Sequence, residues 1–147
     1  MFATLNRYPT NTITFNPTTS KYCVKFDGKT IETTVTDKSS IIDEWVHEIL
    51  SMYDGKPMVV VGLDIEWRPN SSRQENNKAA TLQLCIGEKC LIVQLLYTDC
   101  IPQPLKSFLM DSNFTFVGVR VADDIAKLND DYGIECNKSA DISELAT

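Results

Sequence analysis

The stretch Met58-Val-Val-Val-Gly-Leu-Asp-Ile-Glu-Trp67 predicts a central β-strand that carries two acids. Most of its residues are β-branched or aliphatic, a composition typical of a strand inside a sheet. Asp64 and Glu66 stand two positions apart, so on a strand their side chains point to the same face. Two neighbouring carboxylates at the end of a largely buried strand repel each other and resist desolvation. A divalent cation between them would remove much of that cost, and Mg²⁺ and Mn²⁺ prefer carboxylate oxygens.

The residues before this strand change from a strand period to a helical one. Three runs rich in Thr, Val, Ile and Phe predict strands, and these runs are 12–16, 21–27 and 29–37. Asp27-Gly28 separates the last two runs and is typical of a hairpin turn. From residue 39 to residue 53 the apolar residues follow a helical period. Within that segment, Ser40 and Asp43 have the spacing of a capping box.

The rest of the chain alternates between strands and helices. After a polar loop at 69–78, the pattern predicts two strands, a helix, a strand, a helix ending at Gly133 and a further helical start at Asp141. The expected ranges are 80–86, 90–95, 102–110, 114–119 and 122–132. We therefore expect one α/β domain over residues 1–147 with a mixed sheet, its first 28 residues peripheral and residues 1–11 irregular.

Composition indicates an ordinary globular protein. The 147 residues are 43% hydrophobic and 23% charged. No apolar run approaches the roughly 18 residues that suggest a membrane span, and the N-terminus has no basic start followed by an apolar segment, as a secretory signal would. We therefore expect a nuclear or cytoplasmic protein with no membrane partner.

The net charge of −6 limits how the chain can meet nucleic acid. It argues against a protein that coats nucleic acid nonspecifically, because such binding depends on many cationic side chains. It permits an enzyme that grips one strand end through metal ions and a local basic rim. Arg68, Arg73 and Lys78 follow the acidic strand and form either that rim or a solvated loop.

The five cysteines indicate neither a zinc site nor a catalytic thiol. They are odd in number and lack Cys-x-x-Cys spacing, and His47 is the only histidine. Structural zinc sites take their four ligands in closely spaced pairs, which these cysteines do not form. A Ser-His-Asp or Cys-His site would have to use His47, which lies on a predicted helix. We expect free thiols in a reducing compartment.

Asp123 and Asp124 form a second acidic group, at the start of the helix expected at 122–132. The helix dipole favours acids in the first turn by about 0.3–1 kcal/mol, so the pair has a purely structural explanation. Yet the junction between a strand and a following helix is where α/β folds place functional groups. A second interpretation is therefore that this acidic pair acts together with the two acids of the strand.

Four segments resemble, in the same order, the Werner syndrome-type 3′–5′ exonucleases, especially their plant members. These segments are Val61-Gly-Leu-Asp-Ile-Glu-Trp-Arg-Pro69, Ala79-Ala-Thr-Leu-Gln-Leu-Cys-Ile-Gly87, Cys90-Leu-Ile-Val-Gln-Leu-Leu96 and Phe116-Val-Gly-Val…Asp124-Ile-Ala-Lys-Leu128. The similarity covers about residues 30–147. It implies a DEDD exonuclease with a ribonuclease H-like fold, an α/β mixed sheet flanked by helices.

The resemblance also implies two Mg²⁺ or Mn²⁺ ions between the acids and the scissile phosphate. Asp64 would bridge both ions, and Glu66 would bind the ion that activates water. Asp124 would hold the second ion, because Asp123 falls where relatives carry a small residue. One ion would generate hydroxide and the other would stabilise the leaving 3′ oxygen. The residues expected to contact the nucleic acid, most naturally DNA, are Leu63, Ile65, Trp67 and Arg68. For Trp67, a place in the core is favoured slightly over a stacking role.

The chain departs from the family in its third acidic motif, which has a Tyr or His four residues before an Asp. No such pair follows Asp124, and Asp141 lies in a segment like the one that precedes this motif. We therefore expect the fourth carboxylate and the C-terminal helices over the sheet to be missing. A weak or inactive 3′–5′ exonuclease follows, or alternatively a non-catalytic exonuclease-like module that binds nucleic acid or protein.

The missing helices and the spacing of the two strand acids each have a further consequence. A sheet face without its helices exposes apolar surface, which predicts poor solubility or a homo-oligomer formed through that face. A glycosidase-like use of the two strand acids is disfavoured, because the carboxyls of such enzymes face each other across a cleft.

Overall fold

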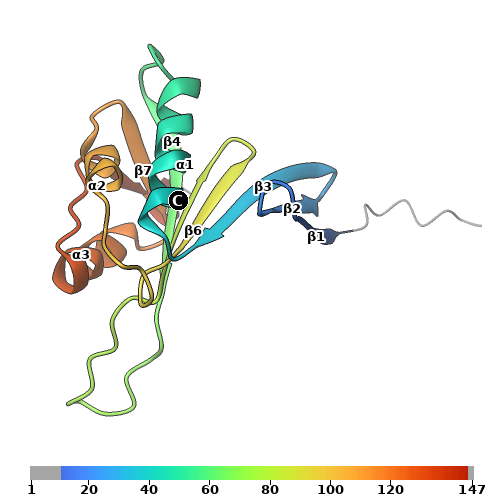
Figure 1. Cartoon of the computed structure of the whole chain (residues 1–147). Coiled ribbons are helices and arrows are strands. Elements are labelled where there is room, and N and C mark those ends of the chain that lie inside the picture. The colour runs from blue at the N-terminus through green and yellow to red at the C-terminus, as the bar shows by residue number, and fades with distance from the viewer. Residues whose placement is uncertain (1–10, 146–147) are drawn as a thin grey trace, which may run out of the picture.

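The computed structural model describes residues 11–145, which form one eight-stranded mixed sheet with helices (Figure 1). The strands are β1 (Thr12–Asn16), β2 (Lys21–Phe26), β3 (Lys29–Thr36), β4 (Val59–Glu66), β5 (Thr81–Ile86), β6 (Lys89–Gln94), β7 (Phe114–Gly118) and β8 (Ser139–Asp141). The helices are α1 (Ser39–Met52), α2 (Gln103–Met110), α3 (Val121–Tyr132) and α4 (Ile142–Leu145). The strand order is β1-β2-β3-β6-β5-β4-β7-β8.

Strand β4, which carries Asp64 and Glu66, lies inside the sheet. It pairs antiparallel with β5 and parallel with β7. β5 continues antiparallel into β6, so β4, β5 and β6 form a three-strand meander. β3 then pairs parallel with β6. The α/β mixed sheet predicted from the alternating periods is therefore confirmed.

Helices α1, α2 and α3 pack on one face of this sheet. The side chains of Val61, Leu63 and Ile65 on β4 are only 0–3% exposed and join the buried residues of these helices in one core cluster. Side chains alternate along a strand, so the residues between them lie on the opposite face. This open face comprises Val60, Gly62, Asp64 and Glu66 of β4, Gln83 and Cys85 of β5, and Val117 of β7.

The N-terminal strands form an arm. Figure 1 shows β1, β2 and the start of β3 reaching away from the body of the molecule. The hairpin predicted at Asp27-Gly28 is confirmed, with φ values of 51° and 74°, as a type I′ turn requires. Residues 1–10, expected to be irregular, lie outside the described residues. No helix in the described range is long and apolar enough to cross a bilayer.

Two predictions of local structure were wrong. The capping box at Ser40 and Asp43 does not form, because the N-cap of α1 is Lys38, two residues before Ser40, and it makes no side-chain cap. The backbone N–H and the hydroxyl of Ser39 instead donate to the Asp99 carboxylate, both at 3.2 Å. The strand β8 was not predicted, because three residues are too few to show a period.

Candidate active site

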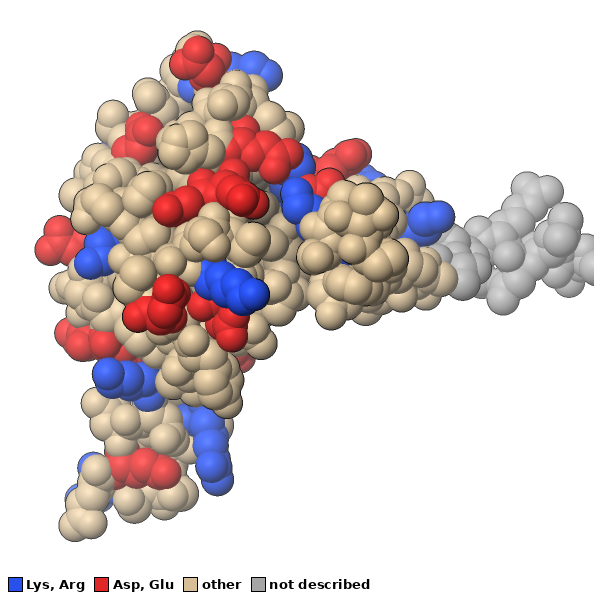
Figure 2. Space-filling model, in the orientation of Figure 1, with Lys and Arg blue, Asp and Glu red and all other residues tan. Residues whose placement is uncertain are grey.

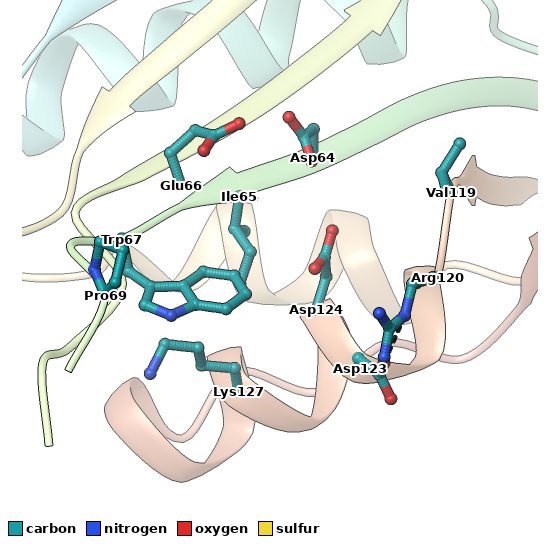
Figure 3. A pocket seen from close by; sticks show the side chains of 10 residues that line it. All are labelled: Asp64, Ile65, Glu66, Trp67, Pro69, Val119, Arg120, Asp123, Asp124 and Lys127. Atoms are coloured by element: carbon teal, nitrogen blue, oxygen red, sulfur yellow. Dashed lines mark hydrogen bonds and ion pairs between the residues drawn. The ribbon is translucent and has the colours of Figure 1, made fainter.

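A cavity of about 600 Å³ opens where β4 ends (Figure 3). From β4 and the loop after it, the lining residues are Asp64, Ile65, Glu66, Trp67 and Pro69. From the junction of β7 with α3, they are Val119, Arg120, Asp123, Asp124 and Lys127. The fold thus brings the two acids of the central strand and the acids of α3, which are distant in the sequence, around one space.

The close approach of β7 to β4 depends on Gly118. A Cβ atom at this position would lie 2.4 Å from the backbone oxygen of Leu63, so the two strands can approach this closely only at a glycine. Arg120 then takes a left-handed conformation, with φ of 53°, and turns the chain into α3. The first turn of α3 therefore places Asp124 beside the β4 backbone.

The carboxyls of Asp64 and Glu66 hydrogen-bond to each other on the open face. This hydrogen bond, together with the negative charge of Asp64, raises the pKa of Glu66. Glu66 therefore holds its proton more readily than an isolated glutamate would. In Figure 3 both side chains project from the same side of β4, opposite to Ile65.

Asp124 is the buried acid of the site, with 7% of its surface exposed. Its Oδ2 atom is buried without a hydrogen-bond partner. Burial, followed by the negative charge of Asp64, raises the pKa of Asp124 to about 6, although a hydrogen bond with the Ile65 backbone acts in the opposite direction. The neighbouring Asp123 is exposed and pairs with Arg120 at 3.0 Å. Of the two acids in the first turn of α3, Asp124 is therefore the one whose negative charge is not compensated by a partner.

The donor chemistry of this site fits a hard divalent cation. All three candidate ligands are carboxylates, which suit Mg²⁺ and Mn²⁺. A cation would relieve both the unpartnered oxygen of Asp124 and the repulsion between Asp64 and Glu66. Within residues 11–145, no three His, Cys, Asp or Glu side chains stand close enough together to hold one ion. Joint binding of one ion by all three acids would therefore need the side chains on β4 to turn toward Asp124.

Lys127 borders the cavity and was not among the residues selected from the sequence. Its Nζ atom lies 5.1 Å from the centroid of the Trp67 ring, donates to the Asn77 carbonyl at 2.8 Å and pairs with Asp131 at 3.2 Å. It therefore ties α3 to both Trp67 and the loop after β4. Its spacing of three residues from Asp124, which places both on one helix face, was the available signal.

The residues predicted to contact nucleic acid are placed in different environments. Leu63 and Ile65 are each 3% exposed and belong to the helix-facing core, although Ile65 also borders the cavity. Trp67 is 39% exposed and borders the cavity, so the core alternative describes it poorly. Arg68 is exposed and does not line the cavity. Contact with a substrate stays a prediction for all four.

The basic residues that line the cavity are not the ones predicted to form a basic rim. Arg120 and Lys127 line it, whereas Arg73 is exposed on the loop and Lys78 lies over the Tyr132 ring at 5.6 Å. Figure 2 shows Lys and Arg side chains interspersed with Asp and Glu on the visible face, without a continuous basic band. This face therefore has no surface suited to coating nucleic acid.

Similarity to known proteins covers most of the chain. A family model described as 3'-5' exonuclease matches residues 33–147. A 3'-5' exonuclease of Arabidopsis thaliana is 33% identical over 110 residues, which make up 71% of this chain and 38% of that protein. The bifunctional 3'-5' exonuclease/ATP-dependent helicase WRN of Mus musculus is 27% identical over 124 residues, 84% of this chain and 8% of that protein.

Solved structures of the EXD2 exonuclease domain share the fold. The form soaked in Mn and GMP aligns with a TM-score of 0.66 and 26% identity, over 78% of this chain and 57% of that one. The form soaked in Mn and dGMP gives 0.67 and 25% over 78% and 57%. The chain thus spans less than two thirds of each of these relatives. The ribonuclease H-like fold is confirmed, and the chain belongs to the DEDD family of 3′–5′ exonucleases.

Proposed function

We propose that this chain is a nuclease domain that hydrolyses phosphodiester bonds from the 3′ ends of DNA, with Asp64, Glu66 and Asp124 as ligands of divalent cations. One observation carries the proposal: these three acids border one cavity, and the Asp124 oxygen inside it is buried without a partner. The family to which the chain belongs, and the relatives' printed activity, support the same reaction.

The residues around the cavity would have different roles in such a reaction. Mg²⁺ or Mn²⁺, when bound, supplies a lower pKa for water and a positive charge beside the leaving oxygen. Asp64 and Glu66 would hold the cations from β4, and Asp124 would hold them from α3. Trp67 offers a ring against which a terminal base can stack, a contact worth about 1–3 kcal/mol in single-strand binding. Arg120 supplies positive charge near a phosphate.

A cleavage assay tests the proposal. The full chain is incubated with Mn²⁺ and 3′-recessed DNA beside an Asp64→Ala variant. Residues 125–147 contain no Tyr or His four positions before an Asp, so the chain supplies three of the family's acids and we expect slow cleavage that the variant lacks. Cleavage of equal rate in the variant would assign the activity to another site or to a contaminant.

Metal binding separates the exonuclease from the non-catalytic alternative. A Mn²⁺ or Mg²⁺ titration followed by protein NMR should perturb the amides around Asp64 and Asp124 together. Binding of metal and DNA without any cleavage would favour a non-catalytic module. Absence of any metal effect at these amides would contradict the ligand assignment itself.

We also propose that the open face associates with a second copy of the chain. Val60 on this face is 58% exposed, and Val119, which borders it, is 60% exposed. Apolar patches of this kind favour association. Sedimentation velocity should show concentration-dependent self-association that Val60→Lys weakens. A monomer at all concentrations would refute this proposal and leave the nuclease assignment untouched.

A further inference from the structure

Cys85 on β5 and Cys90 on β6 face each other across a hairpin, as partners in the strand register. The turn between the strands is Gly87-Glu88, and Gly87 has a φ of +57°. In such a two-residue hairpin the pair that closes the turn, Ile86 with Lys89, is the hydrogen-bonded one, so the next pair is not hydrogen-bonded. Cα atoms at such pairs lie about 4.5 Å apart, within the range of about 4.4–6.8 Å that a disulfide spans.

The two side chains already point toward each other. Their Sγ atoms share a hydrogen bond at 2.9 Å, and both thiols are free. This hydrogen bond lowers the pKa of Cys85 to about 7 and, together with burial, raises that of Cys90. The thiolate is the reactive form of cysteine, so Cys85 is the more nucleophilic sulfur of the pair near neutral pH.

Cys85 is also the more solvent-accessible of the two cysteines. Cys85 is exposed, whereas Cys90 is 8% exposed. Cys85 also lines a hollow of about 380 Å³ on the open face, together with Asp64 and Gln83. Its neighbour on β4 is Gly62, which has no side chain to cover it. A small oxidant therefore reaches Cys85 first and finds Cys90 behind it.

We propose that Cys85 and Cys90 form a redox-reactive dithiol site, which a hydroperoxide converts to a disulfide within the β5–β6 hairpin. The Cys85 thiolate attacks one oxygen of hydrogen peroxide, the O–O bond breaks, and a sulfenic acid and one water result. The Cys90 sulfur then attacks the Cys85 sulfur, the S–S bond forms, and the sulfenic oxygen leaves as a second water. Two thiols lose two electrons, and one peroxide is reduced to two waters.

This site is separate from the proposed cation ligands, although it shares their face. Cys85 pairs with Gly62, and the adjacent position on the same side of β5, Gln83, pairs with Asp64. The dithiol chemistry needs no metal and no substrate. The dithiol proposal can therefore be tested independently of the nuclease activity.

Peptide mapping tests the inference directly. The reduced full chain carrying Cys100→Ser is treated with hydrogen peroxide, its remaining thiols are blocked with N-ethylmaleimide, and it is digested with trypsin. Lys89 lies between the two cysteines, so cleavage after it leaves peptides 79–89 and 90–106 joined only by the disulfide. Replacing the exposed Cys100 removes the other thiol of the second peptide. We expect the linked pair, and dithiothreitol should separate it.

Two controls define the outcomes. In Cys90→Ser, dimedone should label Cys85 as a sulfenic acid and no linked pair should form. In guanidinium the disulfide should form at a rate at least about tenfold lower, because the unfolded chain no longer aligns the two thiols. The inference is overturned if the folded chain yields only unlinked peptides, over-oxidised Cys85 or disulfides between chains. It is overturned equally if linkage is as fast in guanidinium, and circular dichroism confirms which sample is folded.

Discussion

Replacing Asp124 by Asn should stabilise the metal-free chain at neutral pH. Asp124 is 7% exposed, its Oδ2 atom has no partner, and burial followed by the charge of Asp64 raises its pKa from 3.8 to about 6. At pH 7 the carboxylate is therefore ionised in surroundings that disfavour its charge. Asn keeps nearly the same shape without that charge.

The sign and size of the effect follow from linkage. The folded chain binds the Asp124 proton more tightly than the unfolded chain does, so this group contributes its full stabilisation below the unfolded pKa of 3.8. That contribution is lost as the pH rises through about 6. The difference corresponds to about 3 kcal/mol, at about 1.4 kcal/mol per pKa unit. Between about pH 4 and pH 7.5, wild type should lose that much more stability than Asp124→Asn.

Urea unfolding in EDTA across this pH range measures the effect as the difference in the free energy of unfolding between variant and wild type. Using the change in that difference with pH removes any constant cost of the new amide group. Asp123→Asn is the matched control, because Asp123 is exposed, and its difference should vary little with pH. A difference for Asp124→Asn that is equally flat would refute the electrostatic account of this residue.

Manganese should reverse the comparison. A ligand that binds only the folded state stabilises it by about 2.7 kcal/mol at 100 times its dissociation constant. Wild type should gain this stability when Mn²⁺ replaces EDTA, and Asp124→Asn should gain much less because it lacks one ligand. Equal gains would mean that the cation binds elsewhere.

Two substitutions test the packing around the cavity. Gly118→Ala should lower the free energy of unfolding by about 1–3 kcal/mol, because its Cβ would lie 2.4 Å from a backbone oxygen. Gly62→Ala is the control and should change this free energy little, because its Cβ would have no contact closer than 3.6 Å. Equal losses for the two variants in urea unfolding would contradict the argument. Lys127→Met should cost about 2–3 kcal/mol, because its buried acidic partner loses its cation. It should also make Trp67 more accessible to acrylamide in fluorescence quenching, with Trp67→Phe identifying that signal, and unchanged quenching would exclude the positioning role.

The central strands could be predicted from the sequence because one of their faces is buried. Leu63 and Ile65 alternate with Asp64 and Glu66 at the end of β4, and that period indicates which side chains meet the helices. The cap of α1 could not be predicted in this way. Ser39 donates to Asp99, a residue 60 positions away, and only the tertiary structure brings the two together. Local spacing favoured Ser40 with Asp43 because it contains no information about such partners.

The same distinction applies to the site. Asp64 and Glu66 were selected because their chemistry is visible at a spacing of two residues within one strand. Lys127 was missed because the two partners that connect it to the cavity lie on other segments, Trp67 after β4 and Asn77 in the loop before β5. A basic residue inside a helix is ordinarily explained as part of the solvent-exposed face. Only the packing of α3 beside β4 distinguishes this lysine from others on the chain.

The cost of burying Asp124 and the chemistry proposed for it have a single physical origin. A fold selected for stability alone would place an amide or an apolar group at a site 7% exposed to solvent. The chain keeps a carboxylate there, with an unpartnered oxygen beside two further acids. Like charges placed together in this way are relieved only by protons or by a cation. Since protons leave Asp124 as the pH passes about 6, a cation is the group that we propose completes this site at neutral pH.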